Sequence, residues 1–139
     1  MSIWKKEITL DDLNKSSKNS MLEHLGIKLI EIGDDFLIGE MPVDHRTHQP
    51  MGLLHGGASV VLAESLGSIA GNLSCEEGFF CVGLEINANH LSQVKSGVVK
   101  GIAKPIHLGR KTQVWEIRVY REDNKLSCIS RITLSVLKN

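Results

Sequence analysis

The sequence predicts an α+β fold in which an antiparallel sheet wraps around one long central helix, with a short helix near the N-terminus. Three observations predict it. The segment from His55 to Leu73 is too long for a strand, contains no proline and carries small or apolar residues on every side. Four strand-like segments follow from Phe80 onward. No helix-length segment separates those strands, so they are expected to pair antiparallel.

The remaining elements follow from local signals. Thr9 is a suitable helix cap with two acidic residues after it, so a short helix is predicted over residues 10–24. Pro50 and Gly52 mark a loop before the long helix. Strands are predicted at residues 25–32, 36–43, 80–88, 98–106, 114–120 and 126–137. The chain shows no internal repeat, low-complexity tract or linker, so a single domain is expected over residues 1–139.

Charge and composition argue against several classes of partner. Lys and Arg number 16, Asp and Glu number 16, and the formal net charge is zero. Neither nucleic acid nor an anionic membrane surface is therefore expected as a partner. No apolar run follows the N-terminal lysines, and the longest uncharged stretch, residues 47–75, is too polar to span a bilayer. A cytoplasmic location is expected, with Cys75, Cys81 and Cys128 as free buried thiols.

Glu64 is the most informative residue for chemistry. It is the only formally charged side chain between Arg46 and Glu76, and it lies mid-way along a helix that is expected to be buried on all sides. An isolated buried carboxylate is costly and is common at functional sites. The sequence leaves two interpretations open: a catalytic carboxylate, or a structural glutamate in the core or at a dimer contact.

Four further residues accompany this carboxylate. Ser68 lies one helical turn on and shares its face. His90 continues the apolar row that runs from Phe80 to Ala88, which places it at the rim of the core on the helix side. Gly56 begins the long helix, where a free amide without a neighbouring side chain suits an oxyanion. Gln49, in the preceding loop, is a second donor or a ligand contact. Ordinary roles remain open for three of them: helix packing for Ser68, a satisfied core-edge histidine for His90 and a plain helix entry for Gly56.

The spacing of Gly56 and Glu64 bears on assembly. Eight residues on one helix separate them by about 12 Å along its axis, so one small carbonyl group cannot touch both. If both residues act in one reaction, they come from different chains. At least a dimer is therefore expected.

Other catalytic motifs are missing. The chain has no glycine-rich nucleotide-binding motif and no nucleophile elbow. His45, His48 and His55 lack carboxylate or thiolate residues at ligand spacing, so no metal site is expected.

At these residues the chain resembles the hotdog-fold acyl-CoA thioesterases of the 4-hydroxybenzoyl-CoA type. Within them it is most similar to the branch that acts on 1,4-dihydroxy-2-naphthoyl-CoA and on hydroxybenzoyl groups misloaded on carrier proteins. The resemblance covers nearly the whole chain, and its most specific stretches are residues 41–47, 52–57, 63–68 and 83–90.

The resemblance implies a role for each candidate. It implies that Glu64 is the catalytic carboxylate and that Gly56 supplies the oxyanion amide. Gln49 and His55 match the glutamine and histidine beside the thioester. Ser68 matches the hydroxyl that positions water, and His90 matches the strand-end histidine. Candidates for coenzyme A phosphate contacts are Lys95, Arg110 and Lys111, and the alternative for all three is a solvated surface charge. Ser92 stands where close relatives usually carry an arginine, which puts one such contact in doubt. No metal or redox cofactor is implied, and dimers are implied to pair into tetramers.

We therefore expect hydrolysis of an acyl-CoA thioester, with Glu64 as the nucleophile or as the base that activates water. Aromatic acyl groups are favoured and a broad range is expected. The sequence does not choose between coenzyme A and acyl carrier protein as the carrier. Two other interpretations are a hotdog hydratase or dehydratase, whose helix histidine is missing here, and a non-catalytic acyl-binding domain, against which the intact Glu64 argues.

Overall fold

The computed structural model describes all 139 residues, and its main layer is a six-stranded antiparallel sheet. The strands are β1 (Lys28–Ile32), β2 (Leu37–Val43), β3 (Phe79–His90), β4 (Gly97–Leu108), β5 (Thr112–Tyr120) and β6 (Leu126–Lys138). Their order across the sheet is β1-β2-β4-β5-β6-β3, so β1 and β3 form its two edges. The predicted strands are confirmed, although the first begins later than predicted because Gly26 adopts a left-handed φ of 74°.

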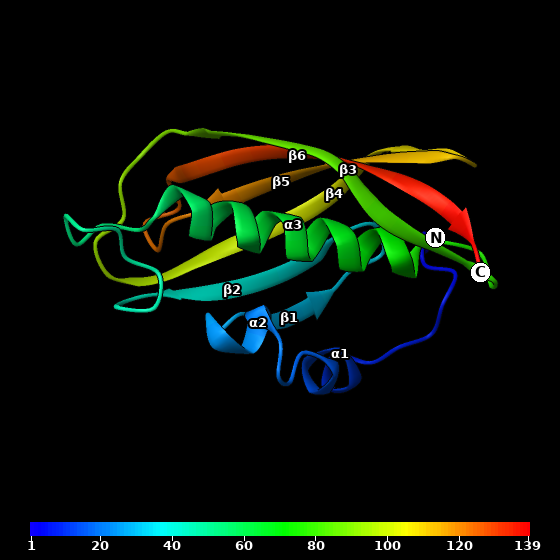
Figure 1. The fold of residues 1–139 in the computed structure, drawn as a ribbon, viewed down its shortest axis with the longest axis horizontal. Coiled ribbons are helices and arrows are strands. Elements are labelled where there is room, and N and C mark those ends of the chain that lie inside the picture. Colours follow the sequence, from blue (N-terminus) through cyan, green and yellow to red (C-terminus); the bar gives the residue numbers. More distant parts are fainter.

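Helix α3 (Gly56–Leu73) lies across one face of this sheet (Figure 1). It packs against β2, β3, β4, β5 and β6. Leu62, Ala63, Leu66 and Ala70 are fully buried on the side of α3 that faces the strands. The predicted arrangement of an antiparallel sheet around one long helix is confirmed. Neither α3 nor any shorter helix has the length and apolarity that crossing a membrane requires.

Small residues allow α3 to approach the sheet closely. A methyl group at Gly67 would lie 2.6 Å from Cγ2 of Ile132 on β6. A methyl group at Gly101 on β4 would lie 2.7 Å from Cδ1 of Leu66. Both distances are too short for carbon atoms in contact. The small residues of α3 and of the facing strands thus set the spacing between the two layers.

One face of α3 is not covered, contrary to the expectation that the helix is buried on all sides. Gly57 and Glu64 are exposed, and Val60, Val61 and Ser68 are only partly buried. The sequence pattern predicted burial of this face because all of these residues except Glu64 are small or apolar. Such a pattern reports what a helix face is made of, and not whether the same chain covers it.

The N-terminal helical region consists of two short helices, α1 (Leu10–Ser16) and α2 (Met21–His24), rather than one helix over residues 10–24. Thr9 caps α1 as predicted. The interruption falls at Asn19, whose φ of 60° lies in the left-handed region. A continuous right-handed helix cannot contain that conformation.

Strand β3 contains a bulge that the alternation of its sequence did not predict. The register against β6 shifts at Leu84, which is an additional residue without a direct partner. The faces of β3 therefore reverse there: Cys81 faces α3 before the bulge, whereas Ile86, Ala88 and His90 face it afterwards. The predicted continuous row from Phe80 to His90 is wrong in its first half and confirmed in its second.

The three cysteines are free and buried, as predicted. The Sγ atoms of Cys75 and Cys81 lie 3.1 Å apart, between the end of α3 and the start of β3. Burial, with a smaller contribution from the hydrogen bond to Cys75, raises the pKa of Cys81 to about 12. Both effects favour the neutral thiol at physiological pH.

The substitution Gly67→Ala is expected to destabilise the protein, although alanine is the better helix former. The added methyl group meets Ile132 and forces α3 away from the sheet. The free energy of unfolding, measured by urea denaturation, should fall by about 1–3 kcal/mol, the usual cost of overpacking. Ser65→Ala, at a partly exposed position of the same helix, is the matched control and should change little. A stabilised Gly67→Ala protein would contradict this account of the packing.

Candidate active site

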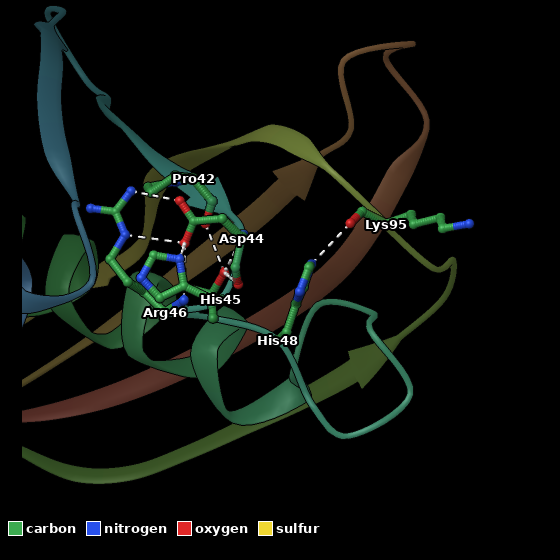
Figure 2. Close-up of polar contacts among 7 residues, drawn as sticks. Pro42, Asp44, His45, Arg46, His48 and Lys95 are labelled. Carbon is green, nitrogen blue, oxygen red and sulfur yellow. Dashed lines mark hydrogen bonds and ion pairs between the residues drawn. The ribbon is translucent and has the colours of Figure 1, made fainter.

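The loop that leads from β2 to α3 is fixed at its start by Asp44 (Figure 2). The Asp44 carboxylate accepts hydrogen bonds from Nε and Nη2 of Arg46 at 3.1 and 2.7 Å. The Arg46 side chain, and then its backbone amide, hold the pKa of Asp44 well below its ordinary value. The hydroxyl of Thr47 donates to the carbonyl of Pro42 at 2.8 Å and closes the turn. The loop therefore leaves β2 in one defined direction.

The same loop is joined to the connection between β3 and β4. Nε2 of His48 is hydrogen-bonded to the backbone carbonyl of Lys95 at 2.9 Å (Figure 2). The amide of Leu54 donates to the carbonyl of Val94 at 2.8 Å. These two contacts hold the loop against residues 91–96 and define one wall of the site.

Gln49 lies at the tip of this loop, and its carboxamide is oriented by a local hydrogen bond. Its Oε1 accepts from the amide of Met51, and its backbone carbonyl accepts from the amide of Gly52 at 2.9 Å. Gly52 has a φ of 77°, a conformation that favours glycine. The Nε2 group of Gln49 donates no hydrogen bond within the protein, so its two N–H groups are free to bind a ligand.

His55 caps the N-terminus of α3. Its Nδ1 accepts from the amide of Gly57 at 2.7 Å, and its backbone carbonyl accepts from the amides of Ala58 and Ser59 at 3.0 and 3.2 Å. Because Nδ1 is the acceptor, the neutral ring carries its hydrogen on Nε2. The amide of Gly56 is the only donor of the first turn that has no partner within the protein.

A pocket of about 360 Å³ lies at this end of α3. Three of the predicted site residues, Gln49, Gly56 and His90, line it together. A methyl group at Gly56 would lie 3.0 Å from Nε2 of His90, so the absence of a side chain lets the imidazole approach the free amide. The pocket thus brings together the free backbone amide of Gly56, the free side-chain N–H groups of Gln49 and the ring of His90.

Glu64 lies outside this pocket. It is exposed on the uncovered face of α3, and its Oε1 lies 3.2 Å from the point that a methyl group at Gly83 would occupy, beside the bulge of β3. α3 is continuous from Gly56 through Glu64, so these two residues of one chain are separated by about 12 Å along the helix axis, as predicted. Ser68 lies one turn beyond Glu64 on the same face, and its hydroxyl forms no hydrogen bond within the protein.

The three basic candidates lie at two separate ends of the molecule. Lys95 is exposed near the pocket, and its side chain is directed away from His48 (Figure 2). Arg110 and Lys111 belong to the turn between β4 and β5. That turn lies near the C-terminal end of α3, since the adjacent Gln113 donates to the carbonyl of Gly71 at 3.3 Å. One chain therefore does not bring these three side chains together.

The three histidines considered for metal binding have separate partners. Nδ1 of His45 lies 3.9 Å from Oδ1 of Asp44. The ring of His48 is hydrogen-bonded to a backbone carbonyl, and His55 caps α3. The structure brings no group of three or more His, Cys, Asp or Glu side chains into a metal-binding arrangement.

Ser59 and Ser127 also line the pocket, and neither was predicted from the sequence. Ser59 follows Gly56 by three residues, so helical spacing was a signal that placed it on the same face. Ser127 lies on β6, and its hydroxyl donates to the carbonyl of Ser92 at 3.2 Å. No sequence signal predicts that contact, because it depends on how β3 and β6 pair.

Residues 51–128 match the family model of the thioesterase superfamily. The chain belongs to the thioesterase superfamily. The proofreading thioesterase EntH of Cronobacter sakazakii is 52% identical to it, over 97% of this chain and 98% of that protein.

Two solved structures agree with this assignment. Thioesterase HI1161 from Haemophilus influenzae is 56% identical, covers 98% of this chain and 95% of its own, and superposes with a TM-score of 0.96. A variant of thioesterase PA1618 from Pseudomonas aeruginosa, with one glutamine replaced by alanine, is 52% identical over 99% of this chain and 100% of its own, with a TM-score of 0.97. The protein has the hotdog thioesterase fold and is a hydrolase of thioesters.

Removing the helix cap should destabilise α3. His55→Ala deprives the amide of Gly57 of its acceptor, and the free energy of unfolding should fall by about 1 kcal/mol, as for other lost caps. His55→Asn keeps a side-chain acceptor at the cap position and should stay within about 0.5 kcal/mol of the unaltered protein. Urea denaturation measures both. Equal losses for the two variants would show that the Nδ1 contact contributes little.

Proposed function

We propose that this thioesterase hydrolyses acyl-coenzyme A to the free acid and coenzyme A, with Gly56 supplying the oxyanion contact. The main support for the proposal is that the free amide of Gly56 lies in the same pocket as the Nε2 group of Gln49, which donates no hydrogen bond within the protein. Attack on a thioester places negative charge on the carbonyl oxygen, and fixed N–H donors stabilise that charge. In the Pseudomonas aeruginosa relative, the glutamine that was replaced also carries the number 49.

Glu64 is the proposed chemical group, by either of two routes. In the first, its carboxylate attacks the thioester carbon, the C–S bond breaks, and water then hydrolyses the mixed anhydride. In the second, it takes a proton from water as the water attacks, with the hydroxyl of Ser68 holding that water. In both routes the thiolate of coenzyme A leaves and is protonated. His90 contacts the substrate beside Gly56, and His55 keeps the helix N-terminus in position.

The complete site is proposed to form between two copies of the chain. Glu64 is too far from Gly56 of its own helix for both to reach one carbonyl, and it lies on a helix face that the chain leaves uncovered. β3 is an edge strand, whose outer backbone groups are free to pair. Two α3 helices packed antiparallel about a twofold axis bring Gly56 of one copy to Glu64 of the other. A dimer is the smallest active unit, and the family resemblance favours a dimer of dimers.

The same twofold arrangement accounts for the separation of the basic residues. It places the N-terminal end of one α3 near the C-terminal end of the other. Lys95 of one copy and the turn with Arg110 and Lys111 of the other then flank one site. These side chains are the proposed contacts for the phosphates of coenzyme A. Ser92, which lines the pocket, supplies no such charge.

The proposed acyl group is aromatic, within a broad range, as in the branch that acts on 1,4-dihydroxy-2-naphthoyl-CoA. A second candidate substrate is an acyl group on a carrier protein, as the resemblance to the branch that acts on hydroxybenzoyl groups misloaded on carrier proteins implies. Both carriers can present a thioester at the same pocket. The three free buried thiols fit a cytoplasmic setting, which we propose as the location.

The variant Glu64→Gln tests the proposed chemical group. The amide keeps the shape of the side chain but removes both the nucleophile and the base, so kcat for benzoyl-CoA should fall by at least about 10²-fold. Glu76→Gln, at an exposed position after α3, is the control and should keep normal kcat. Thermal melting establishes that each variant is folded. If the Glu64→Gln protein is folded and its turnover is near normal, Glu64 is not the chemical group and has only a structural role.

Subunit mixing tests the shared site. Gln49→Ala and Glu64→Gln are each expected to be inactive as homodimers. After exchange, a hybrid dimer holds one intact site, with Gln49 from one copy and Glu64 from the other. Random exchange of equal amounts should restore about one quarter of the activity of the unaltered protein. If differently tagged subunits are shown to exchange and no activity returns, the two residues do not act across the interface.

A further inference from the structure

Ser59 is a buried residue of the pocket lining, and its hydroxyl group forms no hydrogen bond within the protein. The residue is 2% exposed. Its hydroxyl neither donates nor accepts a hydrogen bond, and in particular it does not take the common bond to the carbonyl four residues earlier in the helix. No fully enclosed side-chain nitrogen or oxygen atom lacks a partner anywhere in the structure. Because the Ser59 hydroxyl has no partner, it is not one of these enclosed atoms, and part of its surface is accessible. Ser59 lines the pocket, so we take this accessible hydroxyl to face it.

The other two serines of the pocket are already engaged. The hydroxyl of Ser127 donates to the carbonyl of Ser92 at 3.2 Å, and the hydroxyl of Ser92 donates to the carbonyl of Leu126 at 2.9 Å. Buried polar groups are almost always hydrogen-bonded, because an unsatisfied one costs free energy. Ser59 is thus the one serine of the pocket that is free to bind a ligand.

The size of the pocket indicates which part of the substrate reaches Ser59. Coenzyme A is far too large for about 360 Å³, so its arm has to leave over the open rim, where Leu91 and Gln93 are exposed. The acyl group is then the part of the substrate that occupies the pocket beside the buried Ser59. Ser59 lies one helical turn beyond Gly56, and such neighbours are about 5–6 Å apart. That distance is within the reach of a single acyl ring whose thioester oxygen contacts the Gly56 amide.

We propose that Ser59 is a specificity-determining residue, whose hydroxyl donates a hydrogen bond to an oxygen substituent of the acyl group. The proposal rests on the proposed function, in which the Gly56 amide binds the thioester oxygen. Leu53, Leu54 and Val94 supply apolar contacts to the rest of the acyl group. Acyl groups that carry a suitably placed oxygen satisfy the hydroxyl, whereas unsubstituted groups of the same size leave it without a partner.

The test compares kcat/KM for benzoyl-CoA and its three hydroxybenzoyl isomers in the unaltered enzyme and in Ser59→Ala. For at least one isomer, the preference over benzoyl-CoA should fall by roughly three- to tenfold, as for the loss of one neutral hydrogen bond. Hydrolysis of benzoyl-CoA itself should not fall, because the variant lacks the hydroxyl that benzoyl-CoA leaves without a partner. Ser59→Cys, which is nearly isosteric but a weak donor, should change the preference in the same direction. Ser65→Ala, on the same helix but outside the pocket, is the matched control and should leave the preference unchanged.

Two outcomes overturn the proposal: an equal change for all four thioesters in Ser59→Ala, or no change for any of them. If the unaltered protein hydrolyses none of the four, the proposed acyl-CoA function fails. Calorimetric binding of benzoate and the three hydroxybenzoates then decides the role of Ser59 on its own. Tighter binding of a hydroxylated acid that is lost in Ser59→Ala supports that role, and identical affinities in the two proteins refute it.

Discussion

α3 lies close to the sheet because small residues occur where the two layers meet, at Gly67 on the helix and Gly101 on β4. This close packing holds the middle of the helix against the sheet, where Leu62, Ala63, Leu66 and Ala70 are fully buried. Its N-terminus is held at the loop after β2, where His55 engages three amides of the first turn and leaves that of Gly56 free. Its uncovered face carries Glu64, whose carboxylate lies beside the bulge of the edge strand β3. The positions of Gly56, Glu64 and Ser68, which all lie on α3, therefore depend on this helix–sheet contact.

The pocket depends in turn on contacts between segments that are distant in sequence. The loop with Gln49 is held by hydrogen bonds to the connection after β3, and that connection is held by Ser127 on β6. Three segments thus meet around the helix N-terminus. The folded chain thus holds the N–H donors of Gln49 and Gly56 at one pocket. Under the proposed function, such fixed donors stabilise the charge that develops on the thioester oxygen.

Much of the fold and part of the site could be predicted from the sequence. Length and hydrophobic period placed α3 and the strands, and helical spacing placed Ser68 beside Glu64. The same reasoning failed for the exposure of α3, because an uncovered apolar face and a core face have the same composition. It also failed at Leu84 of β3, where one additional residue reverses the two faces of the strand.

The sequence by itself determined the α+β class, the order of the elements and the residue types available for chemistry, since local period and side-chain identity record these directly. Only the tertiary structure decided that Glu64 is exposed, that the Gly56 amide is the one free donor of its turn, and that Ser59 opens into the pocket. Each of these depends on which groups meet after the chain has folded. Such contacts join residues far apart in the sequence, and no local pattern encodes them.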